Sequence, residues 1–182
     1  MTLSVSALAE LLGQRNYYVR GHLSRLHAVV HVPDDDDDGE PGLRTLHASF
    51  GDYLISRAPT NIRISESFGH ETLARGCLSR MSWNDLCFNV SRSQSSYEKN
   101  RPSGMGNHLA PSLVYACLHW AHHISASPDP SMFDSLIEQV FLPKFLFWLE
   151  VLSVLNKVGS ASGLLRLARS TVSATHQLYQ YF

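Results

Sequence analysis

Short helical patterns of apolar residues open the chain. Leucines at helical spacing predict a helix over residues 7–12, capped by Ser6 and ended by Gly13. A second set of apolar residues, spaced i, i+4 and i+7, predicts a helix over residues 16–26 that Asn16 opens. Two short helices joined by a tight turn indicate a helix-turn-helix unit.

A ribbon is predicted next, around a run of five aspartates. Residues 29–32 are rich in valine and predict a short strand, and residues 43–48 return as a second strand. Between them, residues 34–42 form a loop, because adjacent carboxylates repel and Gly and Pro interrupt regular structure. A helix over residues 49–57, capped by Ser49, then stops before a proline. A hairpin with a long tip after a helical segment is typical of the wing of a winged-helix domain.

The rest of the chain predicts helices only. Each of them begins near a serine or a proline and carries apolar residues at helical spacing. The expected helices run from Ser65 or Ser67 to Met81, from Pro111 to Ile124, over residues 132–140 after Ser131, over residues 144–155 after a break at Pro143, and over residues 160–181. Residues 91–107 are polar, contain Gly and Pro, and predict an exposed loop.

These patterns together predict a mainly α protein. We expect a partial winged helix-turn-helix with a two-stranded wing over residues 1–58, and an all-helical, superhelical array over residues 59–182. The first helix of a winged-helix domain is missing ahead of residue 7. The apolar face that it would cover is therefore expected to be open.

Composition narrows the classes of function. The 182 residues carry 15 Lys and Arg against 16 Asp and Glu, a formal charge of −1, so no overall field draws the chain to nucleic acid or to an acidic membrane. Three cysteines without a CxxC pair indicate reduced thiols, hence a cytoplasmic protein. The most apolar stretch, residues 144–155, is shorter than the ~20 residues that span a bilayer. We expect no membrane partner.

Patterns for catalysis and metal binding are few. His119, His122 and His123 share a helical face and could ligate zinc, but no carboxylate or cysteine at ligand spacing completes the set. The aspartate run lacks the alternating ligands and the distal glutamate of an EF-hand loop. Neither a GxSxG nor a GxxxxGK[ST] pattern occurs. We therefore expect no catalytic activity, no metal and no cofactor.

DNA binding is the usual task of a winged helix. Arg15, Arg20 and Arg25 lie on or beside the second helix and could contact phosphates. Five carboxylates at the wing tip oppose this, because a like-charge contact costs about as much as a phosphate contact returns. DNA binding through these three arginines is therefore the alternative hypothesis rather than the first, and nucleic acid is a disfavoured partner.

Six stretches carry a family resemblance: LSRLHAVVHVPDDDD, LRTLHASFGDYL, GHETLARGCLSRM, LCFNV, SLVYACLHWAHHI and FLFWLEVLSVL. In this order they resemble the region that follows the NACHT nucleotide-binding module in fungal STAND-type (NLR-like) NTPases. The resemblance implies a winged-helix domain and a helical superhelix attached to an NTPase, which is an ATP/ADP switch for oligomerisation in signalling or self/non-self defence. Because the phosphate loop is absent here, it implies a regulatory module whose partner is the nucleotide-binding module or another protein, with homo-oligomers possible.

One residue role follows from this resemblance. STAND proteins often place a histidine near the end of the winged helix, within a Met-His-Asp motif in plant relatives, where it contacts the ADP β-phosphate. Leu46, His47 and Ala48 occupy the comparable place, at the end of the second predicted strand. Ala48 replaces the aspartate, so part of that motif is absent. The resemblance thus implies that His47 senses nucleotide, a role suited to an imidazole N–H; the alternative is that His47 packs at the strand–helix junction.

Overall fold

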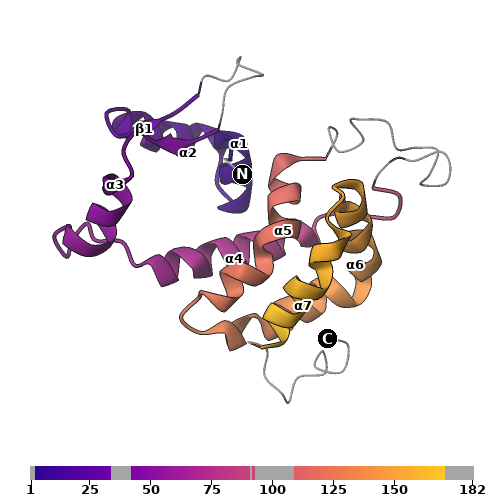
Figure 1. Ribbon diagram of the computed structural model, residues 1–182. Helices are drawn as coiled ribbons and strands as arrows, with labels where there is room; N and C mark the ends of the chain where they lie inside the picture. Colours follow the sequence, from indigo (N-terminus) through magenta and orange to yellow (C-terminus); the bar gives the residue numbers. More distant parts are fainter. Residues whose placement is uncertain (1–2, 34–41, 91, 93–108, 171–182) are drawn as a thin grey trace.

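The computed structural model describes residues 3–33, 42–90, 92 and 109–170 (Figure 1). Its elements are α1 (Val5–Leu11), α2 (Asn16–Leu23), the 3-10 turn η1 (Ser24–Leu26), β1 (Val30–His31), β2 (Arg44–Thr45), α3 (Ser49–Asp52), the π turn η2 (Tyr53–Arg57), α4 (Glu66–Ser82), α5 (Pro111–Ser125), η3 (Pro130–Phe133), α6 (Asp134–Val154), η4 (Val158–Ser160) and α7 (Ala161–Arg169). The prediction of a mainly α fold with a two-stranded ribbon is confirmed.

The start of α1 differs from its prediction by two residues. Ser4, not Ser6, caps the helix, because its Oγ accepts the N–H of Ala7 at 3.2 Å. Gly13 ends the segment as expected, with a positive φ of 62°. The predicted cap of the second helix is also wrong, because Asn16 is already helical.

The ribbon forms where the valine-rich segment predicts it, but it is short. β1 and β2 are antiparallel, with Val30 opposite Thr45 and His31 opposite Arg44. Both strand predictions were longer than the paired residues. The acidic segment 34–41 at the tip lies outside the described residues.

Two contacts fix the ribbon to the helices before it. Arg20 of α2 donates from Nη1 to the carbonyl of Pro33 at 3.1 Å. The N–H of Leu43 donates to the carbonyl of Leu3 at 2.8 Å, just ahead of α1. The ribbon and the helix-turn-helix therefore form one connected unit around a small cluster of buried side chains, Val5, Ala9 and Val19.

A larger core lies among α4, α5, α6 and α7, which Figure 1 shows beside one another. Trp120 and Trp148 are fully buried at its centre, and the indole N–H of Trp148 donates to the carbonyl of Cys117 at 2.9 Å. All three cysteines are free thiols; Cys77 and Cys117 are buried, whereas Cys87 is exposed. Burial raises the pKa of Cys77 to about 12.

α1 belongs to both parts of the molecule. Val5 and Ala9 lie in the small cluster, whereas Leu11 packs into the larger core. Leu11 also lies directly against Gly76 of α4, where no side chain separates the two backbones. Because α1 serves both cores, it connects the ribbon unit to the helical array; the boundary at residue 58 remains a prediction.

Arg80 of α4 anchors this connection with polar contacts. Its side chain is 3% exposed, and its guanidinium carbon lies over the Trp83 ring, 4.5 Å from the ring centroid. It donates to both carboxylate oxygens of Asp85, at 2.7 and 2.6 Å, and from Nε to Glu10 of α1 and Ser112 of α5. Ser112 donates in turn to Glu10. The hydrogen bonds from Arg80 lower the pKa of the Asp85 carboxyl.

The predicted break at Pro143, which would have separated helices over residues 132–140 and 144–155, is wrong. α6 continues through it from Asp134 to Val154. A proline leaves the carbonyl four residues earlier without its helical partner. That carbonyl belongs to Gln139, and both Gln139 and Pro143 are exposed, so water can satisfy it. Burial of Trp148 and its neighbours on the other face offsets the lost hydrogen bond.

The cap before this helix also differs from the prediction. Asp129, not Ser131, accepts the hydrogen bond there, from the N–H of Ser131 at 3.1 Å. The helices predicted from Ser65 and Pro111 begin at Glu66 and Pro111. Among the described residues, no helix combines the length and the apolar character needed to cross a bilayer.

Candidate functional site

A hollow lies where the ribbon meets the segment that follows it. It is lined by Val29, His47, Ser49, Phe50, Asp52, Tyr53 and Arg57. The lining thus includes an imidazole, a guanidinium, a carboxylate and two aromatic rings. The arrangement offers donors for an anion next to rings on which a flat group could stack.

His47 lies at the ribbon–α3 junction predicted for it, and its contacts show which ring nitrogen accepts a hydrogen bond. Its Nδ1 accepts the backbone N–H of Ser49 at 3.1 Å and lies 2.7 Å from the Ser49 hydroxyl. A backbone N–H can only donate, so Nδ1 carries no proton. The neutral ring therefore carries its proton on Nε2. That N–H is free of the contact with Ser49 and can act as a donor.

This contact also corrects the predicted cap. Ser49 was expected to cap the helix, but it is the first helical residue, and the preceding Ala48 makes no side-chain bond. His47 takes the role instead, through the hydrogen bond from Ser49. The residue expected to sense nucleotide thus also stabilises the junction. The alternative hypothesis, that His47 packs at the strand–helix junction, is therefore supported by this hydrogen bond as well.

Arg57 lines the hollow and belongs to an irregular part of the helix, a π turn. The segment Tyr53–Arg57 is a π turn, closed by the N–H of Ala58 on the carbonyl of Tyr53 at 2.8 Å. Both Tyr53 and Arg57 line the hollow. The residue pattern indicated Arg57 only as the end of a helix, because an i to i+5 turn has no signature in such a pattern.

The three arginines of the DNA-binding hypothesis are not equivalent. Arg15 and Arg25 are exposed, ahead of α2 and in η1. Arg20, between them, is half-buried and bonded to Pro33 at the base of the ribbon. The structure therefore leaves two of the three on the surface, and gives the third a structural contact.

One histidine of α5, His123, contacts His70 of α4, a partner that the sequence did not suggest. Nδ1 of His123 lies 2.8 Å from Nδ1 of His70 on α4, and Nε2 of His123 lies 2.8 Å from the hydroxyl of Tyr115. Burial lowers the pKa of His123 to about 4 and also lowers the pKa of His119. Within the described residues, no group of His, Cys, Asp or Glu has the geometry to hold a metal ion.

Comparisons with models of protein families, with curated proteins and with solved structures gave no match to this chain. The relation to STAND NTPases therefore rests on the six sequence stretches alone, and it remains a prediction.

Proposed function

We propose that this chain is a non-catalytic regulatory module of a STAND-type signalling protein. In this role it couples the nucleotide state of a NACHT-type module to assembly with that module or with another protein. The proposal rests on the ordered sequence stretches and on one observation above all, the position of His47. Its Nε2–H is available beside a hollow at the end of the ribbon.

The chemistry of the hollow supports a diphosphate as the group that is sensed. The imidazole N–H of His47 and the guanidinium of Arg57 are donors suited to phosphate oxygens. Phe50 and Tyr53 supply ring faces nearby. Asp52, on the same rim, repels an anion, so binding to the isolated chain is expected to be weak and the nucleotide-binding module is expected to supply the remaining contacts.

ADP binding to the purified chain tests this role. We expect ADP to shift the NMR signals of the His47 ring, and AMP, which has no diphosphate, to shift them much less. His47→Ala and Arg57→Gln should each weaken ADP binding by about fivefold, as expected for one charge-assisted hydrogen bond at an exposed site. The exposed His27, in the loop before β1, provides the matched control variant His27→Ala, which should bind ADP as the unmodified chain does.

Two results would contradict the proposal. If ADP and AMP shift His47 equally, the diphosphate is not recognised and the sensor role is removed. If the purified chain hydrolyses ATP at a rate that survives the His47→Ala and Arg57→Gln substitutions, the chain is an enzyme with a site elsewhere.

A DNA-binding role is the second candidate, because Arg15, Arg25 and the aromatic Tyr17 are all exposed. It predicts a gel shift of duplex DNA that weakens steeply with salt and that the double variant Arg15→Ala, Arg25→Ala reduces. We expect instead no salt-sensitive affinity below the micromolar range, since the acidic tip opposes phosphate contacts. Tight, salt-sensitive binding that the double variant loses would favour DNA over the regulatory role.

A further inference from the structure

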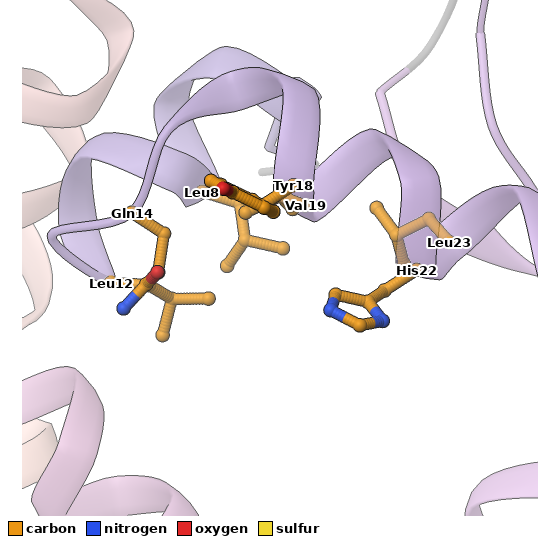
Figure 2. A pocket seen from close by; sticks show the side chains of 7 residues that line it. All are labelled: Leu8, Leu12, Gln14, Tyr18, Val19, His22 and Leu23. Atoms are coloured by element: carbon orange, nitrogen blue, oxygen red, sulfur yellow. The ribbon is translucent and has the colours of Figure 1, made fainter.

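Two features of the described residues play no part in the proposed function. The first is a hollow of about 440 Å³ between α1 and α2 (Figure 2), lined mostly by apolar side chains, with His22 as the only imidazole among the described residues around it. Among those residues, no contact shows what covers it. The second is a cluster of imidazoles between α4 and α5, whose hydrogen bonds limit how many protons it can hold.

The cluster is a chain of three hydrogen-bonded side chains with a fourth ring beside it. His123 lies in the middle, with Nδ1 at 2.8 Å from Nδ1 of His70 and Nε2 at 2.8 Å from the hydroxyl of Tyr115. Each contact is a hydrogen bond only if one of its two atoms donates and the other accepts. His122 lies edge-on to His70, with 5.5 Å between the ring centroids. His123 is 5% exposed, whereas His122 is exposed.

The His70–His123 pair can accommodate one added proton but not two. When both rings are neutral, one Nδ1 donates to the other. When one ring is charged, its Nδ1–H donates to the Nδ1 of the neutral ring, and the Tyr115 hydroxyl can accept or donate as required, so both contacts remain. When both rings are charged, each Nδ1 carries a hydrogen and neither can accept. The hydrogen bond is then replaced by repulsion between two cations.

The charges that act on His123 are all of the same sign. Burial is the main cause that lowers its pKa to about 4, and charges on His70, His122 and His119 lower it further. Among the described residues, no group of α1, α6 or α7, which also pack on α5, contributes to this shift. The carboxylate next to His70, that of Glu71, pairs at 3.6 Å with an arginine one turn later in α4. A second proton on the pair therefore gains no counter-ion from these groups.

The half of α4 that carries His70 has little else to hold it in place. All buried residues of this helix lie between Ala74 and Met81, and none lies in residues 66–73. The helix begins after Ser65, whose side chain makes no capping hydrogen bond, and Gly69 lowers the helix propensity of the first turns. Because it buries so little surface, this half of the helix can separate from α5 while the rest of α4 stays packed.

We propose that the His70–His123 pair is a pH-sensitive switch, which holds residues 66–73 on α5 and releases them when both imidazoles are charged. The released residues follow directly on the α3–η2 region, which Figure 1 shows ahead of α4. The N–H of Ile64 donates to the carbonyl of Leu54 in η2 at 3.0 Å, so the segment before α4 is tied to η2. Release therefore moves η2 relative to α5. The switch does not depend on the nucleotide-sensing role.

Hydrogen–deuterium exchange of the full chain at pH 7.5 and pH 5, followed by mass spectrometry, tests the switch. The rates are corrected for the intrinsic effect of pH on exchange, so the remaining change reports opening. Protection of residues 66–73 should fall by about 25-fold, because His123 binds a proton more readily in the open state than in the closed state. Urea below the unfolding transition should leave this exchange unchanged, since a local opening exposes little surface.

Two substitutions and a matched control isolate the pair. His123→Gln can hydrogen-bond to both partners but cannot be charged, so the pH-dependent loss of protection should shrink to less than about threefold. His70→Gln, at a half-buried position, should reduce the loss in part, because one charge is removed while the burial of His123 remains, and it keeps the test open if His123→Gln does not fold. His122→Gln removes an exposed imidazole outside the hydrogen-bonded chain and should retain most of the pH effect.

Three outcomes would overturn the inference. Equal loss of protection in residues 66–73 and in residues 74–81 would mean that acid opens the whole helix. Exchange of residues 66–73 that accelerates with urea as steeply as global unfolding would mean that no local opening takes place. An undiminished pH effect in both His70→Gln and His123→Gln would assign the opening to other groups. Because none of these measurements involves His47 or nucleotide, they leave the proposed function to its own test.

Discussion

Replacing Gly76 with alanine is expected to lower the free energy of unfolding by about 2 kcal/mol or more, as overpacking of a closely packed site does. A Cβ at this position of α4 would lie well inside van der Waals contact with the carbonyl oxygen of Leu11. The obstacle is backbone, so it cannot rotate away as a side chain would. α1 must move off α4, which also strains the Glu10–Arg80 contact. Urea denaturation followed by circular dichroism measures the change.

Gly69 offers the matched control in the same helix. A Cβ added there meets nothing within 4 Å, so Gly69→Ala should raise the free energy of unfolding by about 0.5–1 kcal/mol through helix propensity. The two substitutions are chemically identical and should act in opposite directions. Equal effects of Gly76→Ala and Gly69→Ala would mean that α1 does not lie against α4 in solution.

Acid is expected to destabilise the protein through His123. Its pKa is about 4 in the folded chain and near 6.5 in the unfolded chain, because burial disfavours the imidazolium. At pH 7.5 the imidazole is almost entirely neutral in both states and the full stability is present. As the pH falls from 6.5 towards 4, the unfolded state binds a proton that the folded state does not, so stability falls. By linkage, this residue alone removes about 2 kcal/mol between pH 7.5 and pH 5.

The comparison of variants isolates this residue from the other titrating groups. His123→Gln has no proton to gain, so its stability should fall less between pH 7.5 and pH 5, by about 2 kcal/mol. His27→Gln removes an exposed histidine and should retain the pH dependence of the unmodified chain. Stability measured by urea denaturation at the two pH values gives both differences. A His123→Gln variant that loses as much stability in acid as the unmodified chain would contradict a neutral, buried His123.

The spacing of apolar residues predicted the helices and the ribbon, because this spacing determines which face of a helix or strand is buried. The apolar stripes of α4 and α5 and the valines of β1 led to the observed elements, with boundaries shifted by a residue or two. The helix after α5 was the main error in the fold. There, the apolar residues on both sides of Pro143 pack into one core, and that burial outweighs the local cost of the proline.

The sites were less accessible to sequence analysis, because their partners are distant along the chain. His70 and His123 are 53 residues apart, and Glu10 and Ser112 are 102 residues apart. Neither pair has a spacing that a helix or a hairpin would produce. His47 was placed correctly at the ribbon–helix junction, but the pattern did not suggest its hydrogen bond with Ser49. Arg57 belongs to a π turn, which the pattern does not encode.

The unequal burial of the three thiols allows the protein to be labelled with a fluorophore at a single cysteine. A maleimide reacts with the thiolate form of an accessible cysteine, so a fluorophore should attach at Cys87 and leave Cys77 and Cys117 unmodified. Cys87 lies two residues after Asp85, the partner of Arg80 in the contact between α1 and α4. A dye at this natural attachment point would sit next to the junction of the two cores, and its emission could report movement there without any engineered cysteine.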